Sequence, residues 1–320
     1  MKIGIIDSRH NCYVTDPDIE RSVFGDAAEV TLYQVSDTCE LPAEAYACDG
    51  FISWHLVPLN RAFFQDVPRC RAVVRAAVGF DNIDLLAAVS HGVQVANVPD
   101  YGTEEVADHT LALALGLLRR VPRGHAVVSG GGWDWRQVGT LPRLSQLRVG
   151  LVGFGRIGMA VARRFQAFGC QVSFYDPYIS SGTEKSLNVQ RCENLDDLLR
   201  DSDLVSLHTP LNDETRHLIG ARELQRLHGK YLVNTARGPL IDGTALAAAV
   251  EAGHLRGVGL DVYENEREAI PEAFCNREEV ILSPHVAFYS EAALPELRRK
   301  AAGVLLDILR SGRHRNVVQP

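Results

Sequence analysis

Three residues of the types used in proton transfer and anion binding each follow a short apolar run: Arg237, Glu266 and His285. If those runs are parallel strands, their carboxyl ends meet at one edge of a sheet, where distant residues come together. An arginine can hold a carboxylate by two parallel hydrogen bonds, and a histidine can give a proton to a carbonyl oxygen. A glutamate bonded to one ring nitrogen would orient that histidine and favour its charged form. The three residue types therefore suit the reduction of a 2-keto acid.

Position alone leaves other interpretations of these residues open. An arginine after a strand more often belongs to a surface or structural ion pair. The other histidines are expected to face solvent or to be hydrogen-bonded in the core. Glu264 lies two residues from Glu266 and competes with it for the same role. The spacing thus indicates a candidate site, but it does not assign a role to each residue in it.

The segment 148–176 has the features of a dinucleotide-binding strand–helix–strand unit. Gly153, Gly155 and Gly158 follow an apolar run in G-x-G-x-x-G spacing and precede a helical pattern. The first glycine permits a tight turn, the second lets the backbone approach a pyrophosphate, and the third lets the helix pack against the sheet. Unpaired amides at the helix start would face the phosphates. The alternative is an ordinary turn that uses glycine for packing only.

The carboxylate of Asp176 indicates which cofactor this unit prefers. Asp176 ends the second apolar run, 23 residues after Gly153, close to the roughly 20 expected for a residue that binds the adenosine ribose hydroxyls. A carboxylate repels the 2′-phosphate of NADP, and the following Pro177 and Tyr178 offer no arginine to hold it. We therefore predict NAD as the cofactor.

The elements that must position these residues alternate between strand and helix patterns in both halves of the chain. The expected strands are residues 2–6, 30–33, 50–53, 71–78, 93–96, 149–152, 172–175, 204–207, 231–234, 258–262 and 280–282. Only the second half carries the glycine fingerprint. The pattern predicts an α/β fold with two Rossmann-like, doubly wound parallel-sheet domains.

Two helices and one loop connect and flank these strands. Thr103 is expected to cap a long apolar helix that carries the chain from one domain to the other, and Ser290 to cap a final helix reaching Leu309. The glycine-rich segment 129–139 holds two tryptophans. It is either an arm that packs on a partner subunit or a folded surface loop.

Composition excludes several classes of protein. A net charge of −7 over 320 residues gives no basic footprint for nucleic acid and matches an anionic membrane surface poorly. Seven cysteines without a CxxC pair favour reduced thiols over disulfides or a zinc site, so we expect no metal. The N-terminus lacks an apolar signal core. We predict a soluble, cytoplasmic protein with a small-molecule substrate and neither nucleic-acid nor membrane partners.

Taken together, the motifs resemble the D-2-hydroxyacid dehydrogenase family over nearly the whole chain. The matching runs are VGFDNID (78–84), GFGRIG (153–158), FYDPY (174–178), VNTARG (233–238), LDVYENE (260–266) and SPH (283–285). The resemblance implies that Arg237, Glu266 and His285 form the catalytic triad and leaves Glu264 as a neighbour. It implies an NAD-dependent oxidoreductase that interconverts a 2-keto acid and a D-2-hydroxy acid, with His285 as proton donor and acceptor.

The resemblance also implies binding residues and a domain plan. The residues expected to contact the cofactor are Gly153, Gly155, Arg156, Ile157, Gly158, Asp176, Thr209, Pro210, Thr215, Thr235, Ala236 and Asp261. Those expected to contact the substrate are Arg75, Val78, Gly79 and Phe288. An NAD-binding domain of residues 100–286 is expected to be inserted into a substrate-binding, flavodoxin-like domain of residues 1–99 and 287–320. Family members are usually homodimers joined through the nucleotide domain.

Within the family, several segments are similar to the C-terminal-binding-protein corepressors. Arg75 matches an arginine that faces the substrate there, and Phe288 stands where they carry a tryptophan. Arg267 departs from the proline that often follows the catalytic glutamate. This branch implies an alternative function, an NADH-sensing dimeric binding protein with little or no turnover. Oxidation of an unusual acid such as phosphite is a third possibility.

Overall fold

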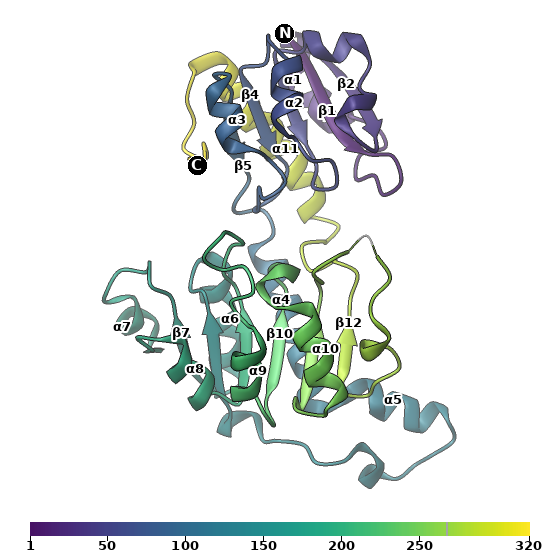
Figure 1. The fold of residues 1–320 in the computed structure, drawn as a ribbon, viewed down its shortest axis with the longest axis vertical. Coiled ribbons are helices and arrows are strands. Elements are labelled where there is room, and N and C mark those ends of the chain that lie inside the picture. Colours follow the sequence, from purple (N-terminus) through teal and green to yellow (C-terminus); the bar gives the residue numbers. More distant parts are fainter. Residues whose placement is uncertain (267) are drawn as a thin grey trace. The chain divides into compact units, whose positions relative to one another are not determined.

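The computed structural model describes residues 1–266 and 268–320, so Arg267 lies outside the described residues. The chain forms two compact units: unit 1 is Met1–Gly102 with Ser290–Pro320, and unit 2 is Thr103–Tyr289 (Figure 1). The sequence placed the two boundaries after residues 99 and 286. Among the described helices, none has the length and apolar character needed to span a bilayer.

Unit 1 is built on a five-stranded parallel sheet with the order β2-β1-β3-β4-β5. Its strands are β1 (Lys2–Ser8), β2 (Glu29–Val35), β3 (Gly50–Ser53), β4 (Ala72–Arg75) and β5 (Gln94–Asn97). Its helices are α1 (Asp18–Phe24), α2 (Arg61–Asp66), α3 (Leu85–Ser90) and α11 (Ala293–Ser311). One face of the sheet packs against α2 and α3 through Phe63, Phe64 and Ala88, while α11 packs on β3 and β4 and against α1.

Unit 2 is built on a seven-stranded parallel sheet with the order β12-β11-β10-β9-β6-β7-β8. Its strands are β6 (Arg148–Val152), β7 (Gln171–Tyr175), β8 (Gln190–Arg191), β9 (Leu204–Leu207), β10 (Tyr231–Asn234), β11 (Gly257–Leu260) and β12 (Val280–Leu282). The order reverses direction at β6 and β9, which is the point where doubly wound sheets bind their ligands. The predicted α/β class with two Rossmann-like parallel-sheet domains is confirmed.

Helices cover both faces of this second sheet, which explains why its strands are almost continuously apolar. The helices of unit 2 are α4 (Thr103–Arg119), α5 (Val121–Ser129), α6 (Arg156–Ala167), α7 (Thr183–Leu187), α8 (Leu195–Asp201), α9 (Ala221–Arg226) and α10 (Gly243–Glu251). One face packs against α4 and α6 through residues such as Leu117 and Phe165. The other packs against α8, α9 and α10 through residues such as Leu198 and Leu246. The stacked rings of Phe154 and Phe174, 3.9 Å between centroids, join β7 to the loop after β6.

The strand predicted over residues 71–78 is shorter than expected, because β4 ends at Arg75. The amide of Ala77 donates to the carbonyl of Arg75 in a tight turn (2.8 Å), and Val98 donates to Ala77 (2.9 Å). The apolar run thus continues into a loop that contains Val78 and Gly79. This loop, and not a strand, carries two of the residues expected to bind substrate.

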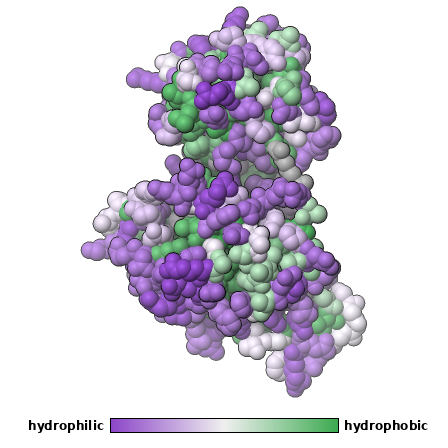
Figure 2. All heavy atoms as spheres, viewed as in Figure 1, coloured by the Kyte–Doolittle hydropathy of each residue, from purple (hydrophilic) through white to green (hydrophobic). Residues whose placement is uncertain are grey.

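The tryptophan-rich segment follows a helix that the sequence analysis did not predict. Arg120 adopts a left-handed backbone (φ 50°) between α4 and α5, so the two helices are separate. Among its described residues α5 buries none, and Trp133 and Trp135 beyond it are 89% and 76% exposed. In Figure 2 the end of unit 2 that holds α5 is coloured white to green, against a mostly purple surface beside it.

A buried ion pair fastens the C-terminal helix to the rest of unit 1. The guanidinium of Arg298 on α11 donates to both carboxylate oxygens of Glu20 on α1, at 2.9 and 2.6 Å. The Glu20 side chain is 0% exposed and that of Arg298 only 12%. Two segments at opposite ends of the sequence are thereby joined by a bidentate contact that water does not screen well.

We expect Arg298→Met to lower the free energy of unfolding by about 3 kcal/mol, because it leaves the Glu20 carboxylate buried without its partner. Urea denaturation measures this loss. Arg299→Met, at an exposed position next along the same helix, is the control and should change stability by less than about 0.5 kcal/mol. Equal losses in both variants would contradict the importance of the pair.

Candidate active site

The three glycines after β6 differ in what surrounds them. A Cβ on Gly153, whose φ is +90°, would lie 2.6 Å from the carbonyl carbon of His208, and one on Gly158 would lie 2.5 Å from the carbonyl oxygen of Gly153. These two positions need glycine because backbone atoms approach them. No described atom lies within 4 Å of a Cβ on Gly155. The second glycine therefore keeps space open in front of the loop, which fits a pyrophosphate held close to the backbone.

Helix α6 begins directly behind this open space. Gly155 is its N-cap, and among the described residues no side chain caps the helix. The amides of the first turn are therefore available to an anion, and the helix dipole favours negative charge there. Arg156 is exposed and Ile157 half-buried in that turn.

The carboxylate of Asp176 lies beside the glycine loop. It accepts hydrogen bonds from the amide of Phe154 (2.8 Å) and from the amide of Tyr178 (2.9 Å). Asp176 thus links the end of β7 to the loop after β6 and remains half-buried. A carboxylate at this position fits the ribose hydroxyls of NAD, and its bond to Phe154 is a structural role that the spacing did not reveal.

His208, which sequence reasoning did not select, lies under the glycine loop. Both of its ring nitrogens are buried and lack a hydrogen-bond partner among the described residues. Burial lowers the pKa of His208 to about 3, so the ring is uncharged at neutral pH. Its place directly after β9, the strand next to β6, is the signal that could have identified it.

The remaining cofactor candidates lie in loops shaped by their own hydrogen bonds. After β9, the hydroxyl of Thr215 donates to the carbonyl of Pro210 (2.7 Å) and closes the loop that begins at Thr209. After β10, the hydroxyls of Thr235 and Thr110 on α4 lie 2.7 Å apart. Each loop ends a strand of the central sheet at its carboxyl edge.

Arg237 is held by the turn that follows β10. The buried Asn234 accepts from the amide of Ala236 (3.0 Å) and donates to the carbonyl of Arg237 (2.9 Å). The guanidinium of Arg237 donates to the carbonyl of Ala236 (2.8 Å) and is half-buried. A Cβ on Gly238 would lie 1.9 Å from the carbonyl oxygen of Tyr263, so this turn lies against the loop that leads to Glu266.

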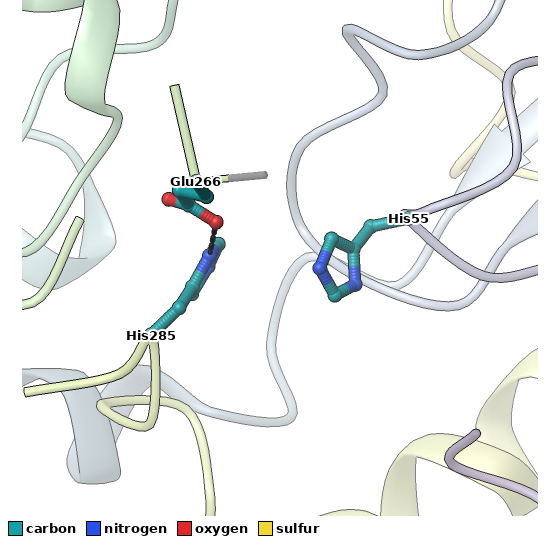
Figure 3. Close-up of side chains that lie close together, drawn as sticks. All are labelled: His55, Glu266 and His285. Atoms are coloured by element: carbon teal, nitrogen blue, oxygen red, sulfur yellow. Dashed lines mark hydrogen bonds and ion pairs between the residues drawn. The ribbon is translucent and has the colours of Figure 1, made fainter. Parts of the chain in front are cut away.

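Glu266 and His285 are brought together by the structure. Nδ1 of His285 lies 2.8 Å from a carboxylate oxygen of Glu266, and the two side chains are 27% and 33% exposed (Figure 3). The ring of Phe288 stands edge-on to that of His285, at 6.2 Å between centroids. His55, also labelled in Figure 3, belongs to unit 1.

The competing carboxylate, Glu264, is engaged elsewhere. It accepts from the amide of Gly243 (2.9 Å) and lies 2.5 Å from Nε2 of His217. Glu264 therefore fastens the start of α10, and the carboxylate that pairs with His285 is that of Glu266.

Asp261, expected to contact the cofactor, organises the loop that carries His285. Its carboxylate accepts from the hydroxyl of Ser283 (2.6 Å) and from the amides of Val286 and Ala287 (2.9 Å each). Its carbonyl accepts from the amide of His285 (2.8 Å). These hydrogen bonds fix the backbone conformation of the loop that follows β12.

The other expected substrate contacts lie in unit 1. Arg75, at the end of β4, is 3% exposed and donates to the side chain of Asn82 (2.9 Å) and to the carbonyl of Ala76 (3.0 Å). The side-chain amide of Asn97 donates to the carbonyl of Val78 (2.6 Å) and holds the loop that leads to Gly79. The substrate-binding candidates are thus divided between the units. Phe288 lies in unit 2, together with the trio of Arg237, Glu266 and His285.

A Rossmann-type unit with a phosphate-ready glycine loop and a histidine–carboxylate pair at its strand ends defines a class: a nicotinamide-linked oxidoreductase. Residues 111–287 match the family model described as D-isomer specific 2-hydroxyacid dehydrogenase, NAD binding domain. The chain is also 38% identical over 266 residues to glyoxylate reductase of Korarchaeum cryptofilum, covering 82% of this chain and 79% of that protein. The chain belongs to the D-isomer specific 2-hydroxyacid dehydrogenase family.

Solved structures agree with this membership. D-lactate dehydrogenase from Aquifex aeolicus, complexed with NAD and lactic acid, superposes with a TM-score of 0.87 at 28% identity, covering 96% of this chain and 95% of that one. The NADPH-dependent glyoxylate/hydroxypyruvate reductase of Sinorhizobium meliloti has a TM-score of 0.86 at 27% identity, covering 99% and 96%. None of these three relatives is named a corepressor, so the family is confirmed and the branch stays a prediction.

The different surroundings of the glycines give a test of the loop. Gly155→Ala should cost less than about 1 kcal/mol of stability yet raise the Kd for NADH at least about tenfold, because its methyl group occupies the open space. Gly153→Ala should lose about 2 kcal/mol or more, since its left-handed backbone and the nearby His208 oppose a side chain. Urea denaturation and quenching of NADH fluorescence measure the two effects. Unchanged NADH binding by Gly155→Ala would contradict this assignment.

Proposed function

We propose that this chain catalyses the reversible, NAD-dependent reduction of a small 2-keto acid to a D-2-hydroxy acid, with His285 as the proton donor in reduction and the acceptor in oxidation. The observation that carries the proposal is the 2.8 Å contact between Nδ1 of His285 and Glu266 at the edge of the nucleotide-binding sheet. The family and the names of its relatives support the reaction class.

Each residue of the trio has a separate task in this proposal. When bound, the reduced nicotinamide supplies a hydride to the carbonyl carbon. Glu266 fixes the tautomer of His285 and stabilises its charged form, so Nε2 can give a proton to the carbonyl oxygen. Arg237 holds the substrate carboxylate through its planar guanidinium. The amides of Val78 and Gly79 assist in binding that carboxylate.

The cofactor residues follow from the loops at the carboxyl edge. Gly153, Gly155 and Gly158 with the first turn of α6, which holds Arg156 and Ile157, would hold the pyrophosphate. Asp176 would bind the adenosine ribose. The loops after β9, β10 and β11 would line the nicotinamide half, through Thr209, Pro210, Thr215, Thr235, Ala236 and Asp261.

We further propose that NAD is preferred over NADP. The carboxylate of Asp176 repels a 2′-phosphate, and the guanidinium of Arg191, which donates to the carbonyl of Asp176 (3.4 Å), is already paired with Glu184. The Sinorhizobium relative is NADPH-dependent, so the preference belongs to these side chains and not to the fold.

The substrate side chain is proposed to be small. The relatives are named for glyoxylate and lactate chemistry, and the ring of Phe288 beside His285 presents an apolar edge. The alternative is a substrate with a second carboxylate, which Arg75 would face as in the corepressor branch. An NADH-sensing protein without turnover is not favoured, because these relatives are named as reductases and dehydrogenases.

Substitutions at the histidine pair test the proposal. His285→Ala should lower kcat at least about 10²-fold with glyoxylate or pyruvate and NADH, while NADH still binds. Glu266→Gln should also lower kcat, since the amide no longer stabilises the charged imidazole, whereas Glu264→Gln should keep most activity. Stopped-flow absorbance at the NADH band measures turnover. Full activity of His285→Ala would remove this residue from the proton-transfer role.

We also propose a cytoplasmic homodimer joined through the nucleotide unit. All seven cysteines are free thiols, and α5 with Trp133 and Trp135 exposes apolar surface of the kind that contacts other proteins. Light scattering after gel filtration should give a dimer for the wild type and a monomer for the Trp133→Glu, Trp135→Glu double variant. A monomeric wild type at about 10 µM, a level at which stable dimers persist, would contradict the proposal.

A further inference from the structure

His109 lies on α4 and reaches the loop that carries His285. This helix packs across β10, β11 and β12, and Nε2 of His109 lies 2.8 Å from the hydroxyl oxygen of Ser283. Ser283 directly follows β12 and precedes His285 by two residues. The same Nε2 lies 3.5 Å from a carboxylate oxygen of Asp261. None of the sequence motifs pointed to His109.

The direction of these hydrogen bonds follows from the number of protons. The Ser283 hydroxyl lies 2.6 Å from the Asp261 carboxylate, which already accepts the amides of Val286 and Ala287. A hydroxyl has one proton, and here it is donated to Asp261. The Ser283 oxygen can then only accept from the imidazole, so Nε2 of His109 carries a proton and donates.

The result is a network of hydrogen bonds that converges on Asp261 and includes the backbone around His285. His109 donates to Ser283, Ser283 donates to Asp261, and Asp261 holds the amides of the two residues after His285. His285 itself has a left-handed backbone, φ +53°, which costs free energy for a residue with a side chain and persists only when its surroundings hold it. The network supplies that restraint.

We propose that His109 and Ser283 are positioning residues, which keep the loop 283–287 on the path that aims Nε2 of His285 at the substrate carbonyl. Neither residue is assigned a proton transfer of its own. The inference rests on the proposed role of His285. It extends the machinery of the site to α4, a helix that is remote in sequence from the trio.

Paired substitutions test this role. His109→Phe keeps a ring but removes the donor, and Ser283→Ala removes the hydroxyl that links His109 to Asp261. Each variant should lower kcat about tenfold or more. The KM for the keto acid and the Kd for NADH should change less than about threefold. His109→Gln, whose amide can donate from the same distance, and Ser283→Thr, which keeps the hydroxyl, should recover most of kcat. Asp108→Ala, the exposed neighbour on α4 that pairs with Arg164, is the control and should match the wild type.

The outcomes separate positioning from mere folding. Thermal unfolding is recorded for every variant, and equal losses of kcat in the Phe and Gln variants, or wild-type kcat in His109→Phe and Ser283→Ala, would overturn the inference. His285→Ala is assayed in parallel. If it retains full turnover, the proposed function fails. If it is inactive while His109→Phe is fully active, only the positioning role fails.

Discussion

The site depends on the burial of one carboxylate, that of Asp261 at the end of β11, whose side chain is 1% exposed. A buried charge is tolerated only when hydrogen bonds replace the water it has lost. The donors here are the Ser283 hydroxyl and the amides of Val286 and Ala287, all in the loop after the neighbouring strand. The loop must follow one path to supply them, and His285 lies in the middle of that path. The solvation of Asp261 thus determines where the imidazole is placed.

At β6, on the same edge of the sheet, the backbone is shaped by the absence of side chains. Gly153 and Gly158 allow the loop after β6, helix α6 and the start of the loop after β9 to touch. Gly155 keeps space for a ligand. The ring of His208 fills the volume beneath without adding charge. The β6 side of this edge therefore offers room and backbone amides, which suit phosphates of any nucleotide. The β11 and β12 side offers side chains that are fixed by polar networks.

Much of the fold could be predicted because its signals are local. β3, β9, β10 and β12 coincide with apolar runs that end at the residues expected, and the glycine spacing located the first turn of α6. The strand at 71–78 was too long because the apolar run continues through a turn made by backbone bonds of Ala77, which side-chain patterns do not report. Helix α5 was missed because Pro122 and Gly124 weaken its pattern, and because the left-handed Arg120 that separates it from α4 has no sequence signature.

The site was less predictable, since its key choices depend on which strand ends are neighbours. The residue types alone did not decide whether Glu264 or Glu266 pairs with His285. The structure decides this, because the carboxylate of Glu264 contacts the amide of Gly243 and the ring of His217 instead. His109 and His208 carry no motif, and their importance comes from tertiary contacts. The side chains of His285 and Glu266 are 27% and 33% exposed. Water screens the attraction within a pair this exposed, and exclusion of that water would strengthen the attraction.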